Sequence, residues 1–469
     1  MNEAQKRRKY RAIKVIITEF FMVLSVIALV FTLTFIVMGY KIGDDGELEQ
    51  DGFLQIRTAP TGAVVTIDDE QLLTRTNLSK AISAGEHEVS FSKDGYDTWK
   101  KTILVTSGLT YRLNYPKLFL KERVEEKIAG FDGLDFTSVS PDDNSLIVAP
   151  SNTKKWQLFS LSEGKPTVKN IDLVEIFPEI ESENFSRIKI LKWNDDSDKI
   201  LALAEWNDKR EWLFIDIKDP KSSKNLTQEF GMDFADIKMK NKSGEQLFIL
   251  ENGNLRKLNI STAEVSRILL SNVERFYNFD SDIIYVGKDE DGKREFGFYQ
   301  EGNNESSKIM ELEDSSDAKM AMGEYYGDVY TTFVVNNNVK IYRGNFGAKQ
   351  EKNVLLVDEE LDFVPSEVNV RGGGELAMLR NGKSYAVYDV ETNKFTRYEL
   401  ENGEIKWMSE FMFSFVDEKG NLIAEDFDKG NRRKVVANVK SGFETPIVAD
   451  KWIYYVDLEF NLKRVKIAD

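Results

Sequence analysis

The chain has 469 residues and a formal net charge of −16, and it contains no cysteine. Disulfides, thiolate metal sites and cysteine nucleophiles are therefore excluded. Hydrophobic residues make up 41% of the chain and aromatic residues 12%, which indicates two or three globular domains rather than a disordered protein.

The charge is unevenly distributed. Residues 1–41 carry a net charge of +5, which leaves −21 for residues 42–469 out of the total of −16. A polypeptide that is this acidic repels polyanions, so we expect no nucleic-acid partner. If the acidic part lies outside the cytoplasm, the absence of disulfides favours a bacterial protein.

Residues 15–40 are predicted to form a transmembrane helix after a basic tail, residues 1–14. No charged residue interrupts Phe20–Tyr40, which is long enough to cross about 30 Å of hydrocarbon. The six Lys and Arg residues of the tail predict a cytoplasmic N-terminus, a single-pass location in the cell membrane and export of the rest. The alternative is a cleaved signal peptide, whose apolar region usually has about 7–15 residues and ends in a small-residue cleavage motif. Here the apolar run is longer and ends in Met38-Gly39-Tyr40.

An acidic linker is expected over residues 41–52, and short strands follow over residues 53–116. These strands alternate apolar and polar residues or are rich in β-branched and aromatic residues, as in AVVTID and HEVSFS, with Gly, Asp and Ser between them. The pattern predicts a small β-domain close to the membrane.

Four segments of this region resemble a PEGA domain, a small β-domain of bacterial and archaeal surface proteins. They are Pro60-Thr61-Gly62-Ala63, Val65-Thr66-Ile67-Asp68, Gly85-Glu86-His87-Glu88-Val89 and Gly95-Tyr96. Two positions depart from the family pattern, because Thr61 replaces the usual Glu and Asp69 the usual Gly. The resemblance implies a surface location and an interaction or spacer role. It names no ligand.

Residues 117–469 show a repeat of about 40 residues, each unit with four short strands, which predicts a β-propeller. Eight blades are favoured and seven remain possible. The last unit has only three strands, so we expect an N-terminal strand near residues 118–126 to complete it and close the ring. The alternative architecture is a pair of β-sandwiches.

Several turns between the first two strands of a unit are polar and acidic. They are Ser140-Pro141-Asp142-Asp143-Asn144, Trp193-Asn194-Asp195-Asp196-Ser197 and Asn241-Lys242-Ser243-Gly244. The first resembles the S-P-D-G turn of TolB-type and WD-related propellers. Asp195-Asp196-Ser197-Asp198 and Asp289-Glu290-Asp291-Gly292 have the alternative interpretation of calcium loops, but neither continues into an EF-hand pattern. We interpret both as chain turns.

No catalytic, cofactor-binding or metal-binding residue is predicted. His87 is the one histidine and lies outside the propeller, which excludes a Ser-His-Asp triad there, and we expect it to be a half-exposed strand residue. Arg371-Gly372-Gly373-Gly374 is expected to be a hairpin between two strands. The aromatic segments Trp452–Tyr455 and Met412–Phe415 are expected to lie in the core.

These features predict a non-enzymatic binding or scaffold protein of the cell surface, whose propeller is the interaction platform for an envelope protein or surface polymer. The alternative is an envelope glycan hydrolase or lyase that uses propeller carboxylates. Inward signalling would need a partner helix, because about 15 cytoplasmic residues are too few for an output domain.

Overall fold

The structure, a computed structural model, describes residues 3–42, 48–161, 164–181, 185–206, 209–240, 242–303, 305–347, 353–371, 373–400 and 405–469. The chain divides into two compact units. The first comprises Met1–Glu122 with Ala468, and the second comprises Arg123–Ile467 with Asp469.

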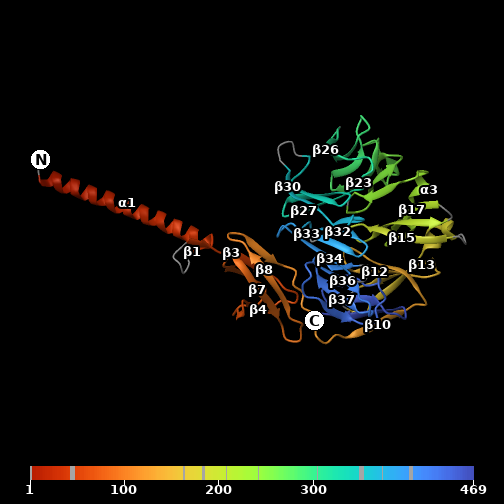
Figure 1. Ribbon diagram of the computed structural model, residues 1–469, viewed down its shortest axis with the longest axis horizontal. Coiled ribbons are helices and arrows are strands. Elements are labelled where there is room, and N and C mark those ends of the chain that lie inside the picture. Colours follow the sequence, from red (N-terminus) through yellow and green to blue (C-terminus); the bar gives the residue numbers. More distant parts are fainter. Residues whose placement is uncertain are drawn as a thin grey trace. The chain divides into compact units, whose positions relative to one another are not determined.

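The first unit begins with a long helix, α1 (Glu3–Val37) (Figure 1). Within it, Lys14–Val37 has a mean hydropathy of 2.8 and is long and apolar enough to cross a membrane. The side chains of this stretch are exposed, so no protein core covers them. Hydroxyl groups in the helix, such as that of Thr32, donate to backbone carbonyls of the preceding turn and do not disrupt the apolar surface.

The segment expected to be an acidic linker forms a β-hairpin. Strands β1 (Tyr40–Ile42) and β2 (Leu48–Gln50) pair antiparallel, and Asp44, Asp45 and Glu47 fall in 43–47, outside the described residues. The Lys41 ammonium lies 2.9 Å from an Asp51 carboxylate oxygen. This ion pair offsets part of the negative charge on which the prediction of a linker was based.

The remainder of the first unit contains two small sheets, ordered β6-β3-β9 and β5-β4-β7-β8. The strands are β3 (Gly52–Ile56), β4 (Val64–Ile67), β5 (Glu70–Gln71), β6 (Leu78–Ile82), β7 (Gly85–Ser92), β8 (Trp99–Val105) and β9 (Thr110–Leu113). Alternate residues of β3 are buried, as the sequence pattern predicts. Leu54, Val65, Phe91 and Trp99 belong to one continuous core between the sheets.

This core includes residues beyond the expected boundary at 116. Leu118 is 1% exposed, and its backbone N–H donates to the Ala59 carbonyl over 2.8 Å. The Lys121 N–H likewise donates to the carbonyl of Gly95. Residues 118–121 therefore belong to the first unit, and the expected closing strand lies at Glu125–Gly130 and not near residues 118–126.

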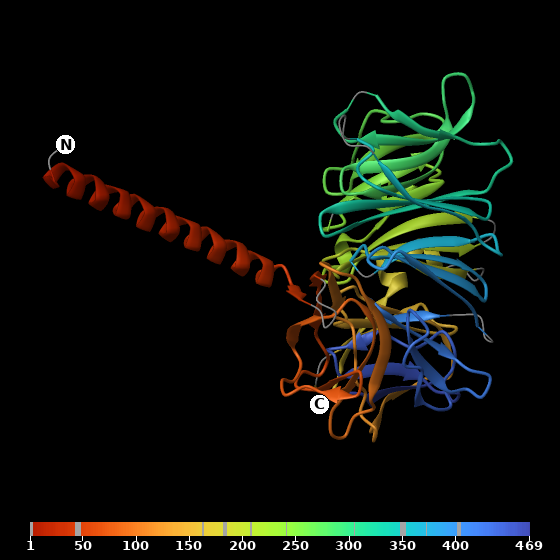
Figure 2. The same cartoon turned by 60° about the vertical axis from the view of Figure 1, so that its left-hand side comes forward.

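The second unit contains, within the described residues, eight four-stranded antiparallel sheets (Figure 2). The first four consist of β11 (Leu134–Val139), β12 (Ser145–Pro150), β13 (Lys155–Ser160) and β14 (Thr167–Asp172); β15 (Phe185–Trp193), β16 (Lys199–Trp206), β17 (Lys209–Asp216) and β18 (Lys224–Asn225); β19 (Asp236–Met239), β20 (Gln246–Glu251), β21 (Asn254–Asn259) and β22 (Glu264–Val265); β23 (Val273–Phe279), β24 (Asp282–Lys288), β25 (Arg294–Gln300) and β26 (Ser307–Glu311).

The next three sheets consist of β27 (Ala318–Tyr325), β28 (Asp328–Val335), β29 (Asn338–Arg343) and β30 (Val354–Glu360); β31 (Glu367–Arg371), β32 (Leu376–Asn381), β33 (Ser384–Asp389) and β34 (Lys394–Glu399); β35 (Lys406–Ser409), β36 (Met412–Val416), β37 (Leu422–Asp426) and β38 (Arg433–Val436). Short helices follow two of the earlier outer strands: α2 (Leu173–Ile176) and α3 (Leu226–Phe230), with 3-10 turns at Pro178–Glu181 and Pro220–Ser222.

The eighth sheet joins the two ends of this unit. Strands β39 (Ile447–Val448), β40 (Trp452–Val456) and β41 (Asn461–Lys466) are completed by β10 (Glu125–Gly130), which pairs antiparallel with β41. The closing strand thus begins at Glu125. Arg464 on β41 contacts the Glu126 carboxylate at 2.7 Å, so the seam also carries an ion pair.

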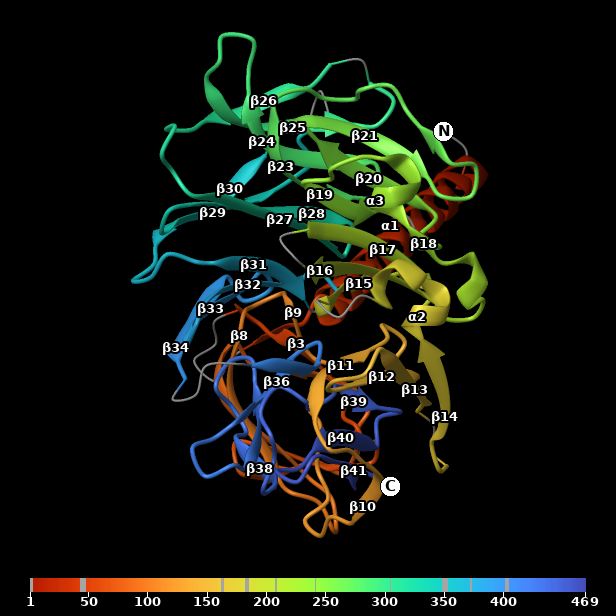
Figure 3. The same cartoon turned by 90° about the vertical axis from the view of Figure 1, so that its right-hand side faces the viewer.

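Six pairs of neighbouring sheets share hydrophobic cores within the described residues. Figure 3 shows these sheets as separate ribbons that follow one another in chain order. One core joins the β11–β14 sheet to the β15–β18 sheet, and another joins the closing sheet back to β11–β14 through residues such as Leu146 and Trp452. This closed arrangement of separate sheets is a β-propeller, and the alternative of two β-sandwiches is wrong. Trp452–Tyr455 and Met412–Phe415 are buried, which confirms that these aromatic segments form core.

Candidate functional site

The first strands of the sheets meet at the centre of the propeller. The Trp193 indole N–H on β15 donates to the Ser138 hydroxyl on β11 over 2.8 Å. A methyl group added at Gly323 on β27 would lie 2.5 Å from the Val370 side chain on β31. Glycine is needed at position 323 because neighbouring first strands approach this closely.

A cavity of about 360 Å³ opens among these central strands. Four consecutive sheets contribute to its wall, in the order of the ring: the sheets that begin with β31, β35, β39 and β11. The lining residues are Thr137, Ser138, Val139, Glu367, Asn369, Arg371, Met378, Arg380, Ile405, Lys406, Trp407, Glu444 and Pro446. This volume lies within the range of small-molecule sites.

Strand β31 supplies three polar side chains to this wall. Glu367, Asn369 and Arg371 alternate along the strand, so they share one face of it. The Asn369 amide donates to one carboxylate oxygen of Glu367 over 2.6 Å, and Arg380 Nε lies 3.2 Å from the other. Glu367 is therefore held by its neighbours and its charge is balanced by Arg380.

Arg371 and Trp407 form the more open part of the wall. Arg371 is exposed and its guanidinium carbon lies 5.9 Å from the centre of the Trp407 ring, a cation–π contact. Trp407 is half-buried, and its indole nitrogen lies 3.2 Å from the Met378 sulfur. The Trp407 ring is thus fixed in orientation, while within the described residues no carboxylate pairs with Arg371.

Glu444 forms a buried part of the wall and is only 2% exposed. One of its carboxylate oxygens accepts the Gly442 N–H over 3.0 Å, and the other has no hydrogen-bond partner within the described part of the chain. Burial raises the pKa of Glu444, although the nearby Lys406 ammonium and backbone N–H groups act in the opposite direction. The site therefore holds a buried acceptor that lacks a donor.

Together these groups can bind a polar ligand. The wall offers three cations (Arg371, Arg380 and Lys406), two carboxyl groups and one oriented aromatic ring. The Lys406 ammonium donates to the Gly442 carbonyl, so that cation is also fixed in place.

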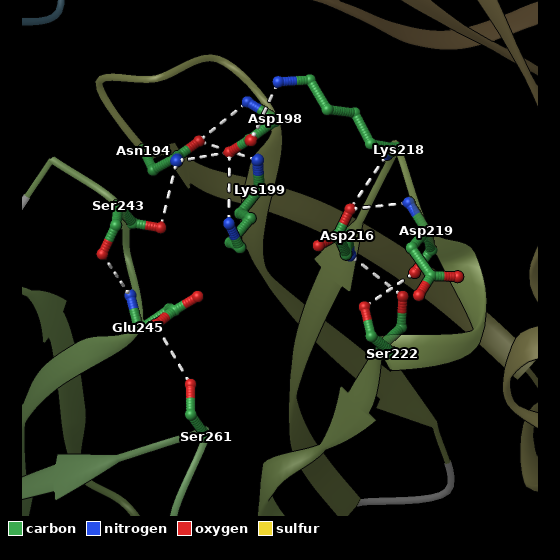
Figure 4. Close-up of polar contacts among 11 residues, drawn as sticks. Asn194, Asp198, Lys199, Asp216, Lys218, Asp219, Ser222, Ser243, Glu245 and Ser261 are labelled. Atoms are coloured by element: carbon green, nitrogen blue, oxygen red, sulfur yellow. Dashed lines mark hydrogen bonds and ion pairs between the residues drawn. The ribbon is translucent and has the colours of Figure 1, made fainter.

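The polar turns singled out in the sequence form a different structure, a chain of hydrogen bonds between neighbouring sheets. The Asp142 N–H donates to the Ser197 hydroxyl over 3.1 Å, and the Asp196 N–H donates to the Lys242 carbonyl over 3.3 Å. Figure 4 shows the link between the second and third of these sheets, where the Asn194 amide donates to the Ser243 carbonyl. These turns therefore join three sheets to one another.

In the two segments with the calcium-loop interpretation, the carboxylates of Asp198 and Asp289 are engaged by groups of the protein. Asp198 accepts from the Asn194 amide and lies 3.0 Å from the Lys218 ammonium, and hydrogen bonds and charges from these groups lower its pKa against the effect of burial. Asp289 accepts the Lys293 N–H and closes a turn in which Gly292 has φ +79°. Over the described ranges, no group of three or more His, Cys, Asp or Glu side chains is placed to hold a metal ion.

His87 is more buried than expected. It is 8% exposed on β7, so the expectation of a half-exposed residue is wrong. Its Nδ1 lies 2.5 Å from an Asp68 carboxylate oxygen, and its Nε2 lies 2.8 Å from the Ser83 carbonyl. Both ring nitrogens thus have partners in the small β-domain, because the turn before β5 folds Asp68 over the strand.

The glycine-rich segment lies between β31 and β32, as predicted. Gly373 and Gly374 have φ +60° and +99°, and Gly372 falls outside the described residues. The sequence interpretation treated the whole segment as a turn and missed that Arg371, its first residue, lines the central cavity. It also missed Glu444, whose neighbours in sequence carry no recognisable motif. The alternation of polar residues along β31 was the one signal that could have indicated this wall.

Comparison with known proteins confirms the resemblance of the small domain. Residues 52–118 match the PEGA domain family, so the chain contains a PEGA domain. Asp69, which stands where the family usually has Gly, has φ +66°, a left-handed conformation that glycine adopts more easily. No curated protein matches the chain in sequence.

Several solved structures are similar to the propeller at low sequence identity. The C-terminal WD40 domain of Sif2 is 12% identical, with a TM-score of 0.48, over 74% of this chain and 99% of that one. The uncharacterized protein lmo1340 from Listeria monocytogenes EGD-e is 14% identical, with a TM-score of 0.40, over 69% and 93%. The fold assignment rests on the chain's own sheets and their order.

Proposed function

We propose that this chain is a membrane-anchored, extracytoplasmic binding or scaffold protein whose propeller holds an envelope protein or surface polymer. The observation that carries the proposal is the exposed apolar stretch Lys14–Val37, which precedes the small β-domain and the propeller. An apolar helix of this length with exposed side chains has the length and composition of a membrane-spanning helix. The basic tail favours a cytoplasmic N-terminus, which puts the small β-domain and the propeller on the outer side of the membrane.

A binding role fits the chemistry of the propeller. Its central cavity carries fixed cations, carboxyl groups and an aromatic ring, which are the groups that recognise polar ligands. The lone histidine is engaged in the PEGA domain by Asp68 and Ser83. The PEGA domain supports a surface location, in which it acts as an interaction module or spacer.

The absence of cysteine allows a direct test of the topology. A single cysteine is introduced either in the tail (Ala4→Cys) or in the PEGA domain at the fully exposed Leu73 (Leu73→Cys). Intact cells are treated with a membrane-impermeant maleimide. We expect labelling of Leu73→Cys alone, and of both variants after lysis. Labelling of Ala4→Cys in intact cells, or a mature chain that lacks the helix, would contradict the anchored topology.

The binding role is tested with the full-length protein in nanodiscs. The sample is incubated with solubilised host envelope, cross-linked, and analysed for both protein and polymer. A saturable partner, competed by unlabelled protein, is expected. If no partner is captured and envelope glycans are instead cleaved, the scaffold role is wrong.

A second candidate is an envelope glycan hydrolase or lyase. The observation that favours it is that two carboxyl groups, Glu367 and Glu444, line one cavity in different environments. Glu367 is paired with Arg380, whereas burial raises the pKa of Glu444, a combination typical of an acid and a charged partner in glycosidases. Release of reducing ends from envelope glycans by the wild type, and its loss in Glu444→Gln, would support this candidate over the first.

A further inference from the structure

The central cavity differs in charge from the protein that surrounds it. Residues 42–469 carry about −21 of formal charge, yet the described residues of the cavity wall include three cations and two carboxyl groups. Arg380 is offset by Glu367, and Lys406 lies near Glu444. Among the described lining residues the remaining cation is Arg371, which is exposed and lies over the ring of Trp407. An anionic group of a ligand is attracted to this point of an otherwise acidic molecule.

The buried end of the cavity requires a hydrogen-bond donor. Glu444 is 2% exposed and one of its oxygens is unpartnered within the described chain. Leaving a buried acceptor unsatisfied is costly, so a ligand that donates to it gains affinity. An ammonium donor would meet the positive charge of Lys406 close to Glu444, whereas a neutral hydroxyl would not.

The middle of the cavity has an aromatic surface. The Trp407 ring is held by contacts with Met378 and Arg371 and is half-buried, so part of it faces the cavity. The C–H groups of a sugar ring pack well on such a surface, and an indole ring adds a large contact area with little loss of side-chain freedom. The volume of about 360 Å³ accommodates one or two sugar residues.

We propose that the central cavity binds an acidic sugar residue, with a sugar hydroxyl donating to Glu444, the sugar ring against Trp407 and the sugar carboxylate on Arg371. This inference rests on the proposed binding function and specifies its ligand class as an acidic glycan of the envelope. A carboxylate matches the planar guanidinium of Arg371 through two parallel hydrogen bonds. A neutral sugar has no carboxylate to pair with Arg371, and a peptide lacks the sugar hydroxyls that donate to Glu444.

The test uses full-length protein in nanodiscs and isothermal titration calorimetry. The probes are a galacturonate trisaccharide, a galactose trisaccharide of the same linkage, and an acidic tripeptide. We expect saturable binding of the galacturonate at least 10-fold tighter than of the galactose, and weakening as salt is raised. Tighter binding of the tripeptide, equal binding of both sugars, or no binding of either sugar would overturn the proposal.

Variants assign the binding to the cavity. Arg371→Ala is expected to remove the preference for the acidic sugar, with partial recovery in Arg371→Lys. Glu444→Met removes the buried acceptor without leaving a buried charge, and we expect at least a 10-fold loss for both sugars. The matched control is Arg397→Ala, on outer strand β34, where the arginine pairs with Glu359. Unchanged thermal unfolding of the variants excludes loss of folding as the cause.

Failure of the cavity assignment can be distinguished from failure of the proposed binding function. If envelope capture by the full-length protein persists in Arg371→Ala and Glu444→Met, the propeller binds its partner elsewhere, and only the cavity assignment fails. If the wild type captures nothing, the binding function fails as well.

Discussion

The side-chain amide of Asn194 donates to the backbone carbonyl of Ser243 over 3.2 Å and thereby joins the turns of two neighbouring propeller sheets. Within its own turn, the Asn194 side-chain oxygen accepts the N–H groups of Asp198 and Lys199. The same amide nitrogen also donates to the Asp198 carboxylate over 2.7 Å. One side chain therefore closes a turn and fixes the spacing between sheets.

We predict that Asn194→Ala lowers the free energy of unfolding of the propeller by about 2–3 kcal/mol. Asn194 is 1% exposed, so its loss leaves buried backbone groups without partners. Urea unfolding followed by tryptophan fluorescence measures the change. Asn170→Ala, at an exposed position on β14, is the control and is expected to change stability by no more than about 0.5 kcal/mol. Equal effects of the two substitutions would contradict the role of Asn194.

Asp457 gives a prediction for acid stability. Although burial opposes its ionisation, hydrogen bonds from Asn461 and Glu459 and the Lys463 ammonium lower the pKa of Asp457 to about 2. Because the folded pKa lies below the unfolded value of about 3.9, ionised Asp457 stabilises the fold above about pH 4, and this stabilisation is lost as the pH falls toward 2.

We therefore expect Asp457→Asn to be less stable than the wild type by about 2 kcal/mol at pH 7, with the difference shrinking between about pH 4 and pH 2. Denaturant unfolding at a series of pH values tests this. Asp195→Asn, at an exposed turn position, is the control for a general change of net charge. A difference that stays constant down to pH 2 would show that Asp457 acts through packing alone.

The sequence was sufficient to predict the helix, the PEGA domain and the propeller, because each depends on local periodicity. Apolar length predicts α1, and alternation predicts the strands. The boundary predicted at residue 116 was misplaced because the apolar pattern of the segment after it fits a strand of either unit. Only the tertiary contact of Leu118 with Ala59 assigns this segment to the first unit. The hairpin β1–β2 was missed because its charges resemble those of a linker, and its ion pair with Asp51 is invisible in sequence.

The central cavity could not be predicted from the sequence. Arg371, Trp407 and Glu444 are far apart along the chain and come from three different sheets. None of the three belongs to a sequence motif. They come close together because the ring closes, and their spacing along the chain gives no sign of it. The buried state of Glu444 likewise depends on the whole ring, so its raised pKa has no local signal.

The turn between β4 and β5 gives a stabilising prediction. Asp68 and Asp69 form its two central positions with φ +49° and +66°, a pair of left-handed residues typical of a type I′ hairpin, which favours Gly at the second position. Asp69→Gly is expected to raise the free energy of unfolding of the PEGA domain by about 0.5–1 kcal/mol. Calorimetric unfolding of the full-length protein measures it.

Asp68→Gly serves as the opposite control for the same turn. The Asp68 carboxylate accepts the Glu88 N–H over 2.9 Å and contacts His87, so its removal is expected to destabilise the domain although the backbone strain is relieved. If both glycine substitutions changed stability in the same direction, backbone conformation would not be the property that distinguishes the two positions.

Closure of the propeller by β10 gives a prediction about its folding. Glu125 on β10 accepts a hydrogen bond from the Tyr455 hydroxyl over 2.5 Å, and Arg464 pairs with Glu126 while lying 3.9 Å from the Trp452 ring. Without β10, strand β41 becomes an unpaired edge and these buried groups lose their partners.

A fragment of residues 123–469, which keeps β10, is expected to be a folded monomer by size-exclusion chromatography, whereas residues 131–469 should aggregate or unfold at a Tm lower by at least about 10 °C. Identical behaviour of the two fragments would mean that the hydrophobic interfaces between the sheets are sufficient to hold the ring and that β10 adds no stability.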